Sequence, residues 1–148
     1  MKRREQFHHI VTPLLELGGI ICIFFASYFL RAITDGIPFV QLRIPKISEE
    51  QFLPFVISGV LFWGIIFASN GLYNSPTGTP LLERLRIVIK KSTLWFFLYI
   101  GFIYLTTGFL FQKEIPRLIV IYVWIFSTLY SLLLRIGLER FSEFLYKQ

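Results

Sequence analysis

The residues that could carry out chemistry are few in this chain and lie far apart. Glu16 interrupts the first long apolar run, and no second acidic residue lies within an apolar run. His8 and His9 are adjacent, close to a basic N-terminus, and Cys22 is the only cysteine. The chain shows no paired carboxylates for acid–base catalysis, no glycine-rich phosphate loop, no nucleophile elbow and no metal-binding spacing. We therefore predict no catalytic site, cofactor or metal ion in this chain, and two histidines solvated at a membrane surface.

The composition places the chain among membrane proteins. Its 148 residues are 55% hydrophobic and 18% aromatic, with a mean hydropathy of +0.64. A soluble domain of this size could not bury so many apolar side chains, whereas a bilayer accepts them on the outside of the fold. The net charge of +6 comes from basic residues that fall between the apolar runs. This distribution favours anionic lipid headgroups as the partner and argues against nucleic acid.

Four apolar runs are each long enough to cross a bilayer as a helix. They lie at residues 13–30, 52–70, 92–111 and 117–134. The sequence predicts one all-α integral membrane domain, a four-transmembrane-helix antiparallel bundle. It also predicts an amphipathic interfacial segment before the third span and an amphipathic C-terminal tail. Residues 31–51 are expected to form either a short hairpin or a segment on the membrane surface.

The first span carries small residues at helical spacing. Gly18, Cys22 and Ala26 recur every fourth residue. Positions four apart lie on one face of a helix, and small side chains there allow another helix to approach closely. The spacing therefore predicts that this face packs against a neighbouring helix.

Glu16 is expected about one turn inside the first span, where a carboxylate needs a basic partner. Ser127, Ser131 and Arg135 recur at fourfold spacing in the fourth run, and Arg135 emerges on the same side of the membrane as Glu16. We predict a structural ion pair between Glu16 and Arg135 that joins the two helices. A proton-relay or substrate-binding role for Glu16 is the alternative.

The segment between the second and third apolar runs combines a turn with a basic helix. Residues 75–80 contain two prolines and a glycine, which predicts a turn. In residues 81–91 the apolar side chains recur on one face, as in a helix that lies in the headgroup layer. The candidate contacts with lipid or phosphate are Arg84, Arg86, Lys90 and Lys91. A solvated loop followed by the start of the third helix is the alternative.

The basic residues also predict how the chain crosses the membrane. Ten of the 15 Lys and Arg residues lie in the N-terminus, the central connector and the tail. Cytosolic segments carry the excess of positive charge. Both termini and the central connector are therefore expected on the cytosolic side of the membrane.

A series of short motifs occurs in order along the chain. They are Glu16 early in the first span, Leu30-Arg31 at its exit, Phe67 to Tyr73 closing the second, Glu83 to Lys91 before the third, Pro116-Arg117 opening the fourth and Arg135 ending it. With Gly71-Leu72-Tyr73 at their centre, these motifs resemble the N-terminal membrane domain of large polyprenyl-phosphate sugar-phosphate transferases. Asn74 departs from this pattern, because a basic residue is expected after Gly-Leu-Tyr.

The resemblance implies a place in the bacterial inner membrane and a role in starting exopolysaccharide, capsule or O-antigen synthesis. In that family a soluble domain and a catalytic domain follow the four spans, and the catalytic domain transfers a sugar phosphate to undecaprenyl phosphate. The chain would then be a non-catalytic anchor and oligomerisation module, with the catalytic domain supplied in cis or in trans. The bilayer, undecaprenyl phosphate and a second copy of the chain are the implied partners. A small stand-alone flippase of lipid-linked sugars and an accessory subunit that recruits a cytosolic partner are the alternatives.

Overall fold

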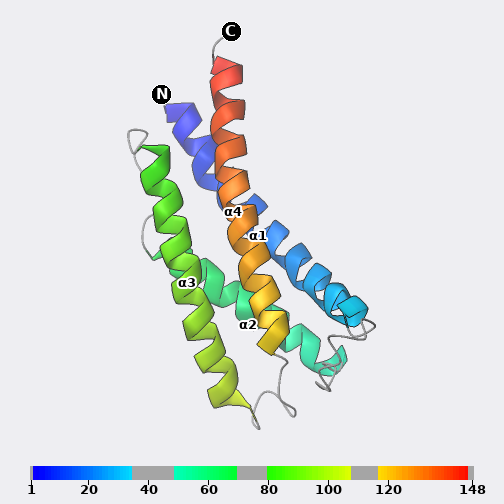
Figure 1. Cartoon of the computed structure of the whole chain (residues 1–148). Helices are drawn as coiled ribbons and strands as arrows, with labels where there is room; N and C mark the ends of the chain where they lie inside the picture. Colours follow the sequence, from blue (N-terminus) through cyan, green and yellow to red (C-terminus); the bar gives the residue numbers. More distant parts are fainter. Residues whose placement is uncertain (1, 35–48, 70–79, 108–116, 147–148) are drawn as a thin grey trace.

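The computed structural model describes residues 2–34, 49–69, 80–107 and 117–146, which form four long helices (Figure 1). They are α1 (Lys2–Thr34), α2 (Glu49–Ala68), α3 (Leu81–Thr106) and α4 (Arg117–Tyr146). Each helix is long and apolar enough to cross a membrane. The chain is thus an all-α, multi-pass membrane protein, as its composition predicts.

The four helices form a ring. α1 packs against α2 and α4, and α3 packs against the same two helices. Figure 1 shows the start of α1, the start of α3 and the end of α4 at the same end of the bundle. We call this end the terminal end. It brings together the segments that carry most of the Lys and Arg residues.

The helices extend beyond the predicted spans at the terminal end. α1 begins at Lys2 and α4 continues to Tyr146. α3 begins at Leu81, so the basic segment 81–91 is the first part of the third helix and continues directly into its apolar part. The reason is local, because no proline follows Pro80 within α3 to interrupt the backbone hydrogen bonds.

At the opposite end α3 is shorter than predicted. It ends at Thr106, before the expected limit at residue 111, and Thr107 has an extended backbone with φ −62° and ψ 127°. The conformation expected for residues 31–51 falls largely on residues 35–48, which lie outside the described chain.

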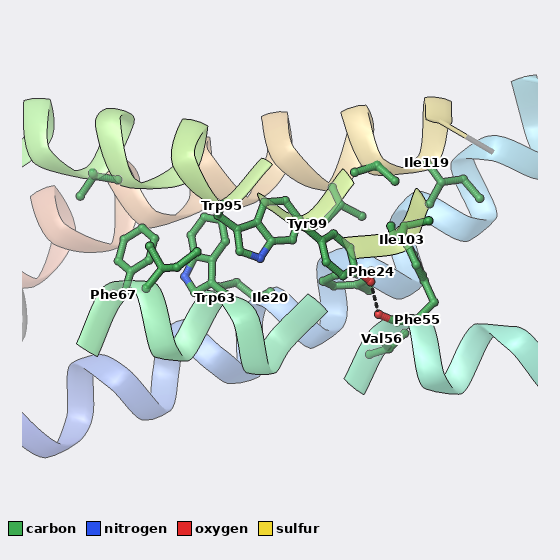
Figure 2. Packing of buried hydrophobic residues seen from close by; sticks show 14 residues of the cluster. Ile20, Phe24, Phe55, Val56, Trp63, Phe67, Trp95, Tyr99, Ile103 and Ile119 are labelled. Atoms are coloured by element: carbon green, nitrogen blue, oxygen red, sulfur yellow. Dashed lines mark hydrogen bonds between the residues drawn. The ribbon is translucent and has the colours of Figure 1, made fainter. Parts of the chain in front are cut away.

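Aromatic side chains from three helices fill the bundle (Figure 2). Phe24 of α1, Phe55 and Trp63 of α2, and Trp95 and Tyr99 of α3 are all fully buried. The ring centroids of Phe24 and Phe55 lie 5.1 Å apart, edge to face, and Trp95 and Tyr99 stack at 5.0 Å. The Tyr99 hydroxyl donates a hydrogen bond to the backbone carbonyl of Phe55, drawn as the dashed line in Figure 2. Because lipid tails are as apolar as these side chains, close packing and hydrogen bonds hold the helices together.

One glycine that lies at a close helix contact is Gly59 of α2, whereas the fourfold spacing in α1 had indicated Gly18. Gly59 of α2 lies so close to a buried ring of α1 that an added Cβ would overlap the ring, and its carbonyl accepts a hydrogen bond from Trp95 Nε1 at 3.0 Å. By contrast, a Cβ added at Gly18 would meet nothing within 4 Å, and Cys22 and Ala26 are exposed. The small-residue face of α1 therefore points away from the bundle. The helix neighbour predicted for this face is absent from the described fold.

Candidate functional site

Glu16 and Arg135 form an ion pair between α1 and α4. Glu16 is completely buried. Arg135 donates from Nη1 to Oε1 at 2.9 Å and from Nη2 to Oε2 at 3.2 Å. Ser131, one turn earlier on α4, donates its hydroxyl to the same Oε1. Both oxygens of the carboxylate are therefore bound by donors from α4.

The fourfold spacing on α4 produces this arrangement. Residues four apart stack on one helix face, so Ser131 and Arg135 both reach α1. The Arg135 guanidinium also lies over the ring of Phe67, with Cζ 5.6 Å from the ring centroid, which extends the contact to α2. Ser127, one turn further from the terminal end, is buried, and its hydroxyl has no hydrogen-bond partner in the described part of the chain. The cluster of Glu16, Ser131 and Arg135 thus joins α1 to α4, and through Phe67 to α2.

The surroundings of Glu16 suit a structural role better than proton transfer. A general base must come within hydrogen-bond reach of its substrate, whereas Glu16 is 0% exposed and both its oxygens accept bonds from α4. The next inward-facing positions along α1 are Ile20 and Phe24, which are apolar and fully buried. These two apolar residues separate Glu16 from the next buried polar residues of α1, Ser27 and Arg31.

The structure separates the four basic residues that were predicted to contact lipid or phosphate. Arg84 is part-buried and donates from Nη2 to Oε1 of Glu139 on α4 at 3.1 Å. Arg86 and Lys90 are exposed, and Lys91 is half-buried. No acidic side chain in the described ranges forms an ion pair with these last three residues. Arg84 therefore helps to hold α3 against α4, and the other three remain available for contacts outside the chain.

Two contacts were not identified from the sequence. The Tyr130 hydroxyl donates to the backbone carbonyl of Leu15 at 2.7 Å. Its ring occupies the space that a side chain at Gly19 would fill. The Gly18-Gly19 pair was a usable signal, although only the packing shows which of the two glycines faces α4. The burial of Arg31, at the end of α1 opposite to Glu16, was likewise not identified from the sequence.

Several predicted features lie outside the described part of the chain. The structure does not describe Gly71, Leu72 and Tyr73. It also does not describe the side chains of His8 and His9. Among the described residues, no group of three His, Cys, Asp or Glu side chains could hold a metal ion.

Comparison with known protein families, characterised proteins and solved structures finds no match to this chain. Its function has to be argued from its residues and its fold.

Proposed function

We propose that the chain is the membrane anchor and oligomerisation module of a bacterial undecaprenyl-phosphate sugar-phosphate transferase that starts surface polysaccharide synthesis. The module is not catalytic by itself, and the catalytic domain acts in cis or in trans. It lies in the inner membrane with both termini in the cytosol. The order of short motifs from Glu16 to Arg135 supports the family, and the excess of basic residues in the terminal segments supports the orientation.

The main support for an anchoring role is the burial of Glu16 and the hydrogen bonds that it accepts. This buried acid has both oxygens bound by Arg135 and Ser131, and the neighbouring interior is filled by packed aromatic rings. A closely packed bundle whose buried charges form an ion pair can position a partner domain at the membrane. Within the four described helices, the buried acid is bound by its own ion pair and is not placed to react with a sugar nucleotide.

The same observation argues against the flippase alternative. A flippase needs polar groups along a path through the bilayer, because the sugar and phosphate of its cargo are hydrophilic. Here the buried residues between the polar cluster and the opposite end include Ile20 and Phe24 of α1 and Tyr99 of α3. The rings of Phe24 and Tyr99 pack edge to face. The hydroxyl of Tyr99 is already bonded to a backbone carbonyl.

The decisive test combines the coding DNA beyond codon 148 with reconstitution. We expect a catalytic transferase domain to be encoded in frame or in a neighbouring gene. In proteoliposomes that contain undecaprenyl phosphate and radiolabelled nucleotide sugars, residues 1–148 alone should form no lipid-linked sugar, and product should appear when the catalytic domain is present. Translocation of a fluorescent lipid-linked sugar by the chain alone would refute the proposal in favour of a flippase. Transfer by the chain alone would refute its non-catalytic role.

The self-association part of the proposal can be tested at the outward face of α1. Cys22 is exposed on that face, so an oxidising catalyst added to native membranes should crosslink two copies through it. Cys22→Ser combined with Leu133→Cys moves the thiol to an exposed position on α4 and is the matched control. Equal crosslinking of both proteins would indicate random collision, and no crosslinking at Cys22 would contradict association through this face.

A further inference from the structure

We propose that the outward face of the first three turns of α3 binds the phosphate of an anionic membrane lipid through Arg86 and Lys90. The inference does not depend on the transferase proposal, because it concerns lipid in the leaflet at the terminal end, whatever the bundle anchors.

The first argument is the selective pairing of basic residues at this end. Arg135 is held by Glu16 and Arg84 is held by Glu139. Arg86 lies two residues beyond Arg84 on the same helix, yet it and Lys90 are exposed and form no ion pair with any acidic side chain that the structure describes. At this end the fold thus pairs the part-buried Arg84 and Arg135 with acidic side chains, whereas Arg86 and Lys90 face outward on α3.

The second argument is that these charges lie among lipid-facing apolar side chains. Leu82 is 80% exposed, Ile89 50% and Phe97 67%. Leu82, Arg86 and Lys90 recur at every fourth residue, and Ile89 is adjacent to Lys90. Phe97 follows Lys90 by seven residues, about two helical turns, so all five residues lie on the outer face of α3. A face that is both apolar and basic suits the boundary between acyl chains and headgroups, where Lys and Arg extend their charged ends towards phosphate.

The third argument is the length of α3. Its 26 residues span about 39 Å as a helix, which exceeds a hydrocarbon core of about 30 Å. When the apolar part up to Thr106 occupies the core, about 9 Å of the helix, roughly its first six residues, extends into the headgroup layer. Arg86 then lies at the boundary of the core. Lys90 lies one turn deeper and can extend its long side chain back towards the phosphates, because side chains tilt towards the start of a helix. Phe97 lies below them beside the acyl chain.

The ligand that fits this surface is a lipid phosphate. The basic pair binds the anionic headgroup, and Ile89 and Phe97 contact its hydrocarbon chain. Arg86 presents a planar fork that suits phosphate oxygens, and Lys90 adds a point charge one turn further along. Free phosphate would gain the charge contacts without the apolar ones, so it should bind much more weakly.

Native mass spectrometry of the purified full chain, titrated with phosphatidylglycerol, phosphatidylcholine or inorganic phosphate, tests the proposal. We expect phosphatidylglycerol to bind more tightly than phosphatidylcholine, and inorganic phosphate to compete poorly. Arg86→Gln and Lys90→Gln should each weaken phosphatidylglycerol binding about fivefold, from the contribution of one basic residue near an anionic surface. The double variant should lose about the product of the two effects.

Arg140→Gln is the matched control, because Arg140 is also exposed at the terminal end but lies on α4. It should change binding less than twofold, because it lies outside the basic outer face of α3. Arg86→Lys with Lys90→Arg keeps both charges and should retain binding, which separates loss of charge from misfolding. Equal losses in Arg140→Gln and Arg86→Gln would show diffuse attraction and overturn the site. Unchanged binding in the double variant, or equally tight binding of inorganic phosphate, would overturn it as well.

Discussion

Replacing Arg135 with methionine should destabilise the bundle more than replacing Glu16 with glutamine. Glu16 is 0% exposed, so Arg135→Met leaves a buried carboxylate without its cation. Breaking a buried ion pair in this way costs about 3–5 kcal/mol. Glu16→Gln keeps a side chain that can still accept the Ser131 hydroxyl, and it leaves Arg135, whose side chain is 10% exposed. That arginine can turn towards the headgroups, and the lost charged hydrogen bonds correspond to about 1.5–3 kcal/mol.

The double variant distinguishes a specific pair from two independent sites. Glu16→Gln with Arg135→Met leaves no charge in the cluster, so its loss of stability should be smaller than the sum of the two single losses. We expect a coupling of about 0.5–3 kcal/mol, typical of residues in one network. Single charge reversals, Glu16→Arg or Arg135→Glu, should impair assembly, and combining them should restore part of it.

Equilibrium unfolding by SDS in mixed micelles, followed by tryptophan fluorescence, measures these free energies, because Trp63 and Trp95 lie in the core. Arg140→Met removes an exposed arginine from the same helix and should change the unfolding free energy by less than about 0.5 kcal/mol. The reasoning is refuted if Arg135→Met is as stable as Arg140→Met. It is also refuted if the single losses simply add in the double variant.

Three further predictions use the same unfolding assay. Gly59→Ala should lower the unfolding free energy by about 1–3 kcal/mol, because its Cβ would overlap the buried Phe24 ring, whereas Gly101→Ala meets nothing within 4 Å and should be neutral or stabilising by up to about 1 kcal/mol; equal effects would contradict the close approach at Gly59. Tyr99→Phe removes the hydroxyl bonded to an α2 carbonyl and should cost about 0.5–1.5 kcal/mol, and an unchanged stability would argue against that bond. Arg84→Gln removes a part-exposed ion pair and should cost no more than about 1 kcal/mol, with the effect shrinking in high salt; a larger, salt-insensitive loss would contradict the assignment.

Much of the fold could be predicted from the sequence, because it depends on properties of single segments. The length and hydropathy of each apolar run predict four membrane-crossing helices, and the structure confirms an all-α bundle. The Glu16–Arg135 pair could also be predicted, since a carboxylate inside a span requires a cation and the fourfold spacing on α4 indicated one at the correct depth. The helix limits at the terminal end were harder to predict. A basic amphipathic segment has the same pattern whether it forms a separate surface helix or, as here, the first turns of α3.

The rotation of each helix about its own axis, which decides the side chains that point inward, was determined only by the tertiary structure. Gly18 and Gly19 are adjacent in sequence, yet a Cβ at the first meets nothing and one at the second meets Tyr130. Arg84 and Arg86 are equally basic, yet only Arg84 turns inward to Glu139. A span can satisfy its hydropathy at any rotation about its axis, because lipid and a neighbouring apolar helix are equivalent environments for most of its side chains. The rotation is fixed by the few polar and aromatic contacts that helices distant in sequence make with one another.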